Sequence, residues 1–374
     1  MILGRGLLIE DCVSWPDAVR PAGTLLLNPT LAPAARNAIL STEFPRLSNH
    51  VWIASSGSGG RLKVIALSRI ALEASANAVN EHLRTELSDR WLNPLPRFHV
   101  GGLGIVVRAF LVGSRCDFLP RWSAEEFVRA ARVHGSTLAS LVPTQVYDLV
   151  VARATCPPAL RAVVVGGGAL DEDLHVRAAE LGWPLLPSYG MTETGSQVAT
   201  TQPGAEDFVW LPLLDHVEAR ISEAGLLELR GPSLLTGWML FASGGSARWE
   251  NPKHDGWFRT NDRAELQKGK LRFLGRADDL TKIRGELVDV AALESALQAR
   301  VPSGLVRIDP SPDPRNGIAL TVVAENAAAE AEARGADELF PPYARPVAFR
   351  VGPVALSPLG KKIRSVTHTC SGGL

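Results

Sequence analysis

The sequence of 374 residues predicts an α/β protein in which a large N-terminal domain (1–277) precedes a small, mobile α+β domain (278–374). From Val51 onward, short apolar runs alternate with helical periodicity, which is typical of mostly parallel sheets covered by helices. After Gly225 the strands become short and closely spaced, which indicates a small barrel-like region. Past Asp278 a compact set of two helices and two strands follows.

Capping residues locate the helices of the large domain. Ser68 can cap a helix with one apolar face, and Ser123 opens a capping box for a helix that extends to His134. Asp171 can cap a third helix, which Gly182 ends. Strands are expected between them, at 137–142, 160–165 and 184–187. Strand–turn–helix units in this order predict a parallel sheet.

The second half of the chain is predicted to contain shorter elements. Strands of the barrel-like region are expected at 226–230, 257–260 and 271–274. In the C-terminal domain we expect helices at 290–297 and 326–334 and strands at 305–308 and 318–324. The first 50 residues carry no chemistry that the sequence identifies.

Composition excludes several classes of protein. Lys+Arg and Asp+Glu both number 39, so net charge gives no reason to expect a nucleic acid or an anionic membrane as partner. The four cysteines form no C-x-x-C pair, which argues against a zinc site or a disulfide framework and favours a reducing cytoplasm. Charges at Arg5, Glu10 and Asp11 interrupt any signal-peptide core, and the apolar stretch Gly104–Gly113 contains Arg108. We therefore expect a cytoplasmic protein without a membrane partner.

A glycine- and serine-rich segment at 55–63 is the first candidate for ligand binding. Small and hydroxyl-bearing residues let backbone N–H groups approach phosphate oxygens, and a lysine adds positive charge. The residues proposed to contact phosphate are Ser55, Ser56, Gly57, Ser58 and Lys63. No G-K-[ST] follows, so this is not a Walker A loop. An ordinary surface loop is the alternative.

A second candidate lies at Ser188–Thr194. The hydroxyl of Thr192 can meet a phosphate oxygen, and the carboxylate of Glu193 is the hard oxygen ligand that Mg²⁺ prefers. Tyr189, next to Gly190, offers a flat face for a purine. Alternatively, Thr192 is the N-cap of a helix whose dipole Glu193 stabilises.

Three further polar segments follow toward the C-terminus. Asp262 can accept both hydroxyls of a ribose, although a solvated turn aspartate is the more common role of such a residue. The segment Gly275–Gly285 combines two glycines with a charge cluster and suits either a rotating or an ordinary linker. Ser357–Arg364 presents a basic pair on a turn.

Together and in this order, these segments resemble the adenylate-forming superfamily of acyl-CoA synthetases, luciferases and adenylation domains. Residues 55–63 resemble its phosphate loop, and Tyr189–Glu193 resembles its Y-G-x-T-E motif. Asp262 matches its ribose aspartate, 275–285 its hinge segment, and Lys361 its C-terminal catalytic lysine. The glycine-rich segment that lies along adenine is matched by Gly166, Gly167, Gly168 and Ala169.

The chain also departs from the family pattern. Gly59 replaces a hydroxyl of the phosphate loop, and Leu62 replaces its proline. Asn261 stands where glycine usually precedes the ribose aspartate. Lys361 is followed by Lys362, which leaves the choice of catalytic lysine open. The region before the phosphate loop is shorter than in most members, so part of the N-terminal subdomain is expected to be reduced.

Within the superfamily, the sequence resembles the o-succinylbenzoate–CoA ligases of menaquinone synthesis at 96–103, 141–145 and 189–197. The resemblance implies ATP, Mg²⁺ at Glu193, and coenzyme A as co-substrate. It implies that Arg276 reaches the ribose–phosphate region and that the small domain rotates about Asp278 between two half-reactions. The residues expected to line the pocket for the acid are His99, Gly101, Gly102, Arg108, Ser196 and Gln197.

Several alternatives stay open at this point. His99 is either a pocket residue or an ordinary buried or capping histidine. Arg108 either pairs with a second carboxylate of the acid or extends its stem to solvent. The activated acid passes either to coenzyme A or to a carrier protein, and a non-catalytic nucleotide-binding relative is a further reading. Whether the chain forms a homodimer is also open.

Overall fold

The computed structural model describes residues 2–3, 6–9, 23–29, 31, 33–56, 62–168, 170–205, 207–242, 246–277, 280–283, 286–313, 317–341 and 344–354. The chain divides into two compact units. The first contains 1–260 and 264–273, and the second contains 261–263 and 274–374. The sequence placed the boundary at Asp278, which lies outside the described residues.

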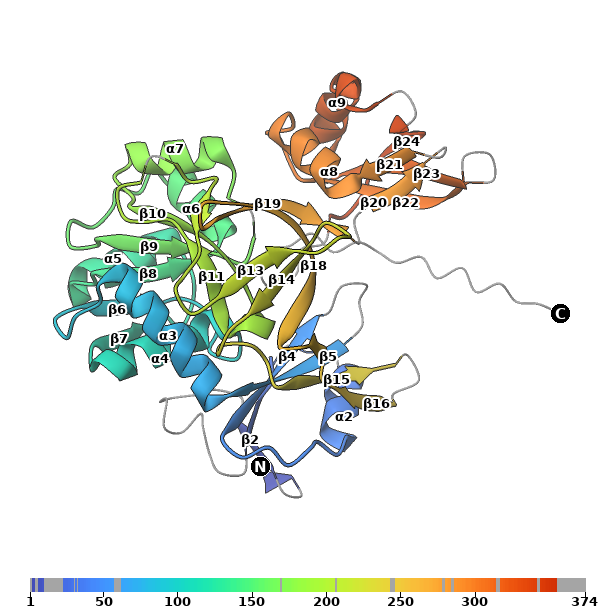
Figure 1. Ribbon diagram of the computed structural model, residues 1–374. Helices are drawn as coiled ribbons and strands as arrows, with labels where there is room; N and C mark the ends of the chain where they lie inside the picture. The colour runs from blue at the N-terminus through green and yellow to red at the C-terminus, as the bar shows by residue number, and fades with distance from the viewer. Residues whose placement is uncertain are drawn as a thin grey trace. The chain divides into compact units, whose positions relative to one another are not determined.

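A six-stranded sheet forms the centre of the first unit (Figure 1). Its strands lie in the order β11 (Ser196–Thr200), β10 (Leu185–Met191), β9 (Ala162–Val165), β8 (Leu138–Leu141), β6 (Arg90–Asn93) and β7 (Arg115–Phe118). All neighbours are parallel except the β10–β11 hairpin. Strands β8 and β9 are buried along their whole length, as strands covered on both faces must be.

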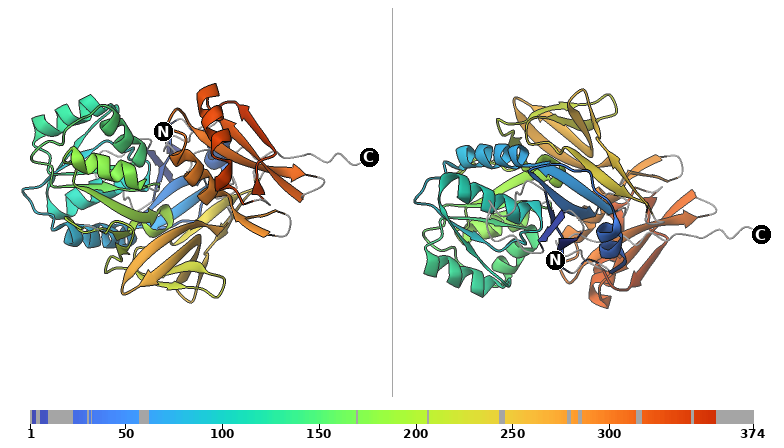
Figure 2. Two further views of the ribbon diagram at one scale, coloured as in Figure 1. Left: turned by 90° about the horizontal axis from the view of Figure 1, so that it is seen from above. Right: turned by 90° about the horizontal axis from the view of Figure 1, so that it is seen from below.

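Helices cover both faces of this sheet (Figure 2). The helices α3 (Arg69–Leu83) and α4 (Val100–Val112) share one buried cluster with β6, β8 and β9. The opposite face packs against α5 (Ala124–His134), α6 (Pro143–Val151) and α7 (Glu172–Glu180). The predicted caps are confirmed, because the side chains of Ser68, Ser123 and Asp171 each accept a backbone N–H from the first turn.

A second, seven-stranded sheet is mixed rather than mostly parallel. Its order is β1 (Ile2–Leu3), β2 (Gly6–Ile9), β3 (Thr24–Leu26), β4 (His50–Ser56), β5 (Leu62–Ser68), β15 (Gly237–Phe241) and β16 (Ala247–Glu250). Only β2, β3 and β4 run parallel. With the helix α2 (Pro33–Ser41), this sheet shows that the first 50 residues contribute regular structure, which the sequence analysis did not predict.

The predicted barrel-like region is a third sheet of short strands. Its order is β12 (Leu211–Pro212), β19 (Lys270–Arg276), β18 (Trp257–Gln267), β14 (Leu226–Arg230) and β13 (Glu218–Ile221), with β17 (Lys253–His254) against β18. The antiparallel pairs β13–β14, β12–β19 and β17–β18 agree with the prediction. The strand expected at 226–230 is confirmed, and those at 257–260 and 271–274 are parts of longer strands.

The second unit has the predicted α+β composition. It contains β20 (Leu280–Ile283), β21 (Glu286–Asp289), α8 (Val290–Ala299), β22 (Val306–Asp313), β23 (Gly317–Ala324), α9 (Ala327–Gly335) and β24 (Ala348–Val351). An apolar core of its own joins both helices to β22 and β23. In the described part of the chain, the helices are all too short or too polar to span a bilayer.

A partly buried histidine between β12 and β13, whose ring nitrogens are both shielded from solvent, makes the first unit sensitive to acid. Neither ring nitrogen of His216 has a hydrogen-bond partner among the described residues, and burial lowers its pKa from 6.5 to about 4. The folded state therefore binds this proton less readily than the unfolded chain does. The free energy of unfolding of the first unit therefore changes little above pH 6.5. It falls as the pH drops from 6.5 toward 4, because the unfolded chain then binds a proton at His216 that the folded state does not bind.

Between pH 6.5 and pH 5 we expect this histidine to remove about 2 kcal/mol from the free energy of unfolding. Urea titrations at the two pH values measure that loss, and His216→Phe should abolish most of it. An equal loss in the wild type and the variant would show that His216 is not the group responsible.

Candidate active site

Four of the predicted nucleotide-binding residues of the first unit follow strands of the six-stranded sheet. Gly167 and Gly168 follow β9 after one intervening residue, and Thr192 and Glu193 come directly after β10. Since the carboxyl ends of parallel strands meet at one edge, the sheet brings both segments to the edge where α/β proteins bind ligands. Gly167 has φ +80°, a conformation that favours glycine.

The turn after β10 is a single 3₁₀ turn, η2 (Thr192–Thr194), rather than the start of an α-helix. Met191 occupies the N-cap position, so the alternative prediction of Thr192 as N-cap is wrong. The backbone carbonyl of Glu193 accepts a 2.8 Å hydrogen bond from the amide of Leu235. Thr194 is fully buried, and its hydroxyl lies 3.0 Å from the carbonyl oxygens of Met191 and Ser196. These contacts fix the turn and present Thr192 and Glu193 side by side.

Gly190 is required by the hairpin that follows. A Cβ atom at this position would lie 1.9 Å from the carbonyl oxygen of Ser196, because β10 and β11 approach closely there. The neighbouring Tyr189, predicted to face a purine, stacks on Phe273 with ring centroids 5.6 Å apart and an interplanar angle of 29°. The close approach and the stacked ring together hold the Y-G-x-T-E segment in place.

Arg108 is the most unusual side chain in the first unit. It lies in α4 and is 1% exposed, so the alternative in which its stem extends to solvent is wrong. Burial lowers its pKa to about 9. None of the ion pairs among the described residues includes it, and its Nε has no hydrogen-bond partner there. A buried cation without a counter-charge is costly, so this arrangement indicates a site for an anion.

Two predicted substrate residues hold the Arg108 guanidinium. Its Nη2 donates to the hydroxyl of Ser196 at 3.2 Å. The amide of Gln197 is satisfied when its oxygen faces Nη1 and Nη2 at 3.3 and 3.0 Å and its nitrogen donates to Thr200 at 2.6 Å. The ring of Trp91 lies 5.7 Å from the guanidinium carbon. The sequence analysis named Arg108, Ser196 and Gln197 but missed Thr200, for which no motif gives a signal.

The other predicted substrate residues lie at the start of the same helix. His99 is the N-cap residue of α4 but makes no side-chain capping bond, and burial lowers its pKa. Its ring lies against Phe98 at 4.6 Å. A Cβ on Gly102 would lie 2.3 Å from the carbonyl oxygen of Pro96, so this glycine is needed for packing. Gly101 has more room, because a Cβ there would lie 3.5 Å from the nearest side chain.

The phosphate-loop residues lie on the β4–β5 hairpin. Ser55 in β4 pairs with Lys63 in β5, and Ser56 is the last residue of β4. The ammonium of Lys63 lies 4.1 Å from the centroid of the Trp238 ring. The remaining predicted residues, Gly57, Ser58, Ala169, Asp278 and both lysines 361 and 362, lie outside the described residues.

The second unit contains the predicted ribose-binding pair. Asp262 in β18 is 5% exposed, and its Oδ1 lies 3.0 Å from Nη1 of Arg276 in β19. The neighbouring Arg263 forms an ion pair with Asp289, which also caps α8. Asp262 is therefore a carboxylate held by an arginine, which differs from the solvated turn aspartate of the alternative prediction.

No three His, Cys, Asp or Glu side chains gather into a metal-binding group within the described ranges. The prediction of Mg²⁺ at Glu193 thus names a single protein ligand rather than a cluster. That suits Mg²⁺, which is commonly held by one or two carboxylates together with nucleotide phosphates and waters.

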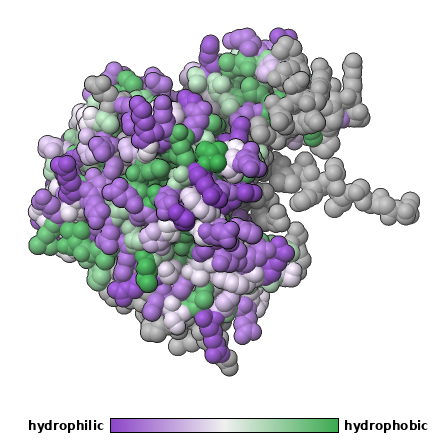
Figure 3. All heavy atoms as spheres, in the orientation of Figure 1, coloured by the Kyte–Doolittle hydropathy of each residue, from purple (hydrophilic) through white to green (hydrophobic). Residues whose placement is uncertain are grey.

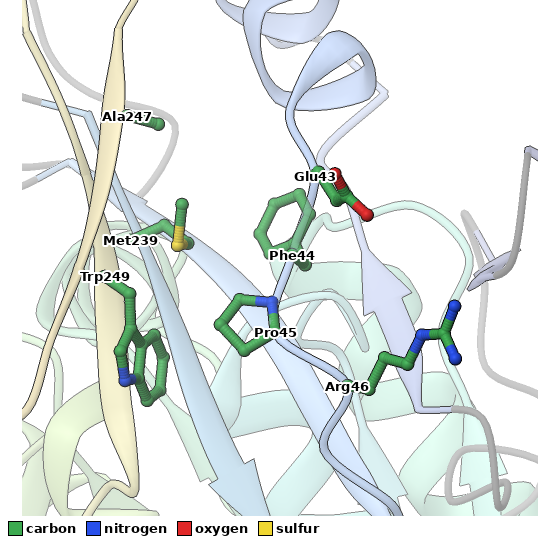
Figure 4. A pocket seen from close by; sticks show the side chains of 7 residues that line it. All are labelled: Glu43, Phe44, Pro45, Arg46, Met239, Ala247 and Trp249. Carbon is green, nitrogen blue, oxygen red and sulfur yellow. The ribbon is translucent and has the colours of Figure 1, made fainter.

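A cavity of about 490 Å³ lies elsewhere on the first unit (Figure 4). In Figure 4, Phe44 and Pro45 lie across from Met239 and Trp249, while Arg46 points away from them. None of the predicted site residues lines this cavity. It therefore belongs to a different part of the molecule from the Arg108 cluster.

Comparisons with known proteins show which proteins this chain is similar to in sequence. A sequence model of the AMP-binding enzyme family matches residues 42–234. The 2-succinylbenzoate–CoA ligase of Escherichia coli is 32% identical over 251 residues, which are 66% of this chain and 51% of that protein. The Bacillus licheniformis ligase of the same name is 30% identical over 258 residues, or 65% of this chain and 53% of that protein. The chain thus spans about half the length of these curated relatives.

Solved structures show the same fold. A variant of E. coli MenE with bound OSB-AMS superposes with a TM-score of 0.76 at 25% identity, covering 94% of this chain and 84% of that one. The o-succinylbenzoate coenzyme A synthetase of Bacillus subtilis, in complex with ATP and magnesium ion, gives a TM-score of 0.77 at 22% identity. That superposition covers 93% of this chain and 85% of that structure.

Proposed function

The chain belongs to the family of AMP-binding enzymes, and from this premise we propose that it is an ATP-dependent acid–CoA ligase acting on o-succinylbenzoate. The acid would first become an acyl adenylate and then a thioester of coenzyme A. The relatives of similar sequence carry the name 2-succinylbenzoate–CoA ligase. One solved neighbour is described as bound to the acyl-adenylate intermediate OSB-AMP.

The observation that carries the proposal is the buried charge of Arg108, which has no ion-pair partner in the part of the chain that the structure describes. A monocarboxylic acid spends its only carboxylate on the reaction with ATP. A dicarboxylic acid keeps a second one, which can neutralise a buried guanidinium and form paired hydrogen bonds with it. Ser196 and Gln197 would keep the guanidinium oriented toward that carboxylate.

The reaction has two steps. In the first, an oxygen of the reacting carboxylate attacks the α-phosphorus, and the bond to the departing pyrophosphate breaks. Thr192 would donate its hydroxyl to a phosphate oxygen, and Asp262 would accept the ribose hydroxyls beside Arg276. Bound magnesium, held at Glu193, would neutralise phosphate charge. The residues act mainly by positioning and by stabilising charge, since little covalent chemistry is needed.

In the second step the thiol of coenzyme A attacks the acyl carbon, and AMP leaves with the bonding electrons. The thiol proton must pass to solvent or to a base. Rotation of the second unit about Asp278 would withdraw Lys361 and bring the segment near Gly285 to the site. One site could then serve both steps.

Lys361→Ala tests this division of labour. We expect ATP–pyrophosphate exchange to fall about 100-fold or more, because the variant loses the charge that bridges carboxylate and phosphate. Thioester formation from supplied acyl adenylate should be nearly unchanged. The same measurements on Lys362→Ala serve as the matched control. An equal loss of both half-reactions in Lys361→Ala would contradict the proposal, and the pattern in Lys362→Ala would identify that lysine instead.

Pyrophosphate release tests the function as a whole. It should depend on an aromatic dicarboxylic acid, and thioester should form only when coenzyme A is present. Release without any transfer to coenzyme A would favour loading of a carrier protein. No release with any acid would favour a non-catalytic nucleotide-binding relative.

A further inference from the structure

Strand β7 is the last strand of the six-stranded sheet, and within the described residues it pairs on one side alone, with β6. It contains no proline, the residue that most simply blocks an edge. An edge strand with free backbone groups is a template for pairing with another strand.

The direction of the backbone groups follows from a single hydrogen bond. The amide of Leu119, just after β7, donates to the carbonyl of Asn93, the last residue of β6, at 3.0 Å. In a parallel pair the N–H and C=O of one residue point the same way, and successive residues alternate. Arg115 and Asp117 therefore face β6. Cys116 and its neighbours at 114 and 118 direct their N–H and C=O groups away from the sheet.

The outward groups limit how a second copy of β7 could pair. A closed dimer has a two-fold axis, so the two edge strands must run antiparallel. Only registers that place outward residues opposite each other form hydrogen bonds. If the two-fold axis passed through residue 115, the two Arg115 side chains would lie directly opposite each other. If it passed through residue 117, the two Asp117 side chains would do so. Both arrangements are repulsive. Centring the axis on Cys116 instead places each Arg115 opposite Asp117 of the second copy.

The side chains are suited to this pairing. Arg115 is more than half exposed, and its Nη2 lies 2.8 Å from Oδ1 of Asp117 on the same face of the strand. The other carboxylate oxygen of Asp117 is buried and has no hydrogen-bond partner among the described residues, and Nδ1 of His134 lies 3.8 Å from it. In the paired arrangement, Arg115 of a second copy would lie opposite Asp117 and bring a second positive charge to this carboxylate.

Exposed apolar side chains lie close to this edge. Phe118 in β7 and Phe110 on α4 are both exposed, and α4 packs against β7. A Cβ on Gly113, at the end of α4, would lie 3.3 Å from the exposed side chain of Leu87. Figure 3 shows a hydrophobic patch at the left margin of the first unit, in the area where Figure 1 places α4 and β7. Apolar surface of this kind favours a protein partner over water.

We propose that two copies of the chain associate through β7, joining their six-stranded sheets edge to edge about a two-fold axis at Cys116. The partner is a second copy because the edge is complementary to itself: its positive and negative residues exchange places under the two-fold rotation. This inference does not depend on the identity of the acid or on the enzymatic activity.

Charge reversal gives a sharp test. In Arg115→Asp both residues of the pair are acidic, and in Asp117→Arg both are basic, so each variant alone should repel its own copy. Sedimentation velocity should give twice the 40.1 kDa of one chain for the wild type and a single chain for each variant. An equimolar mixture of the two variants should return to the dimer mass, because every acidic residue then faces a basic one. The double variant Arg115→Asp/Asp117→Arg should also dimerise.

Arg177→Asp is the matched control, because it removes a similar exposed pair with Asp173 on α7 and should leave the dimer intact. Circular dichroism and thermal melting establish that each variant is folded. Arg115→Gln removes the charge without reversing it, so this variant should weaken the dimer less than Arg115→Asp does. If Arg115→Asp does not fold, Arg115→Gln takes its place in the experiment. A wild-type protein that stays monomeric up to the highest concentration at which it remains dissolved would overturn the proposal. So would folded variants whose mixture stays monomeric, or an Arg115 variant that dimerises like the wild type.

Discussion

Replacing Arg108 with methionine is expected to lower kcat/KM for the dicarboxylic acid by about 1000-fold, since truncating one partner of a buried charge pair costs about 4 kcal/mol. The KM for ATP should change little, because Arg108 lies in α4 and contacts Ser196 of β11 rather than the phosphate loop. A monocarboxylic aromatic acid should be used by the variant about as well as by the wild type.

Stability gives an independent readout of the same substitution. In the absence of ligand, Arg108 is a buried cation with no carboxylate partner among the described residues. Methionine has a similar length and needs no counter-charge, so the free energy of unfolding should stay the same or rise. Arg129→Met on α5, which removes an exposed pair with Glu126, is the control and should change neither activity nor stability. Loss of activity together with loss of stability would point to a structural role for Arg108.

Asp89→Ala is expected to lower the free energy of unfolding of the first unit by about 2 kcal/mol, because Thr137, Glu86 and the partly exposed Arg161 lose their hydrogen bonds to a carboxylate. Asp89 is 6% exposed and receives two hydrogen bonds from Arg161, at 3.0 and 2.7 Å. The hydroxyl of Thr137 and the amide of Glu86 complete its coordination at 2.6 and 2.8 Å. The cluster joins the amino ends of β6, β8 and β9, so its loss should loosen the sheet.

Urea titration at pH 7 measures this effect, with Asp173→Ala on α7 as the control. The Asp173–Arg177 pair is exposed, so its loss should cost less than about 1 kcal/mol. Burial favours a higher pKa for Asp89, but the hydrogen bonds from Arg161, Thr137 and Glu86 outweigh it and hold the pKa below 3.8. The contribution of Asp89 is therefore present above pH 3.8 and is lost as the pH falls below it. Equal midpoints for the two variants at pH 7 would contradict the assignment.

Local patterns predicted the elements that depend on residues close in sequence. Ser68, Ser123 and Asp171 cap α3, α5 and α7 as expected, because a cap bond joins residues three positions apart. Local patterns were less informative for the seven-stranded sheet, where β5 pairs with β15 from more than 160 residues further along the chain. Periodicity within a strand does not specify such a distant partner.

The sequence by itself predicted the chemistry that is proposed for this protein. The Thr192–Glu193 pair, Asp262 and Lys361 occur in the order of an adenylate-forming enzyme, and Arg108 is a charge within an apolar helix. Only the tertiary structure decided that Arg108 is buried rather than solvated, and that Ser196, 88 residues away, holds its guanidinium. The physical reason is that the cost of burying a charge depends on every group packed around it, and those groups come from β11, α4 and β6 together.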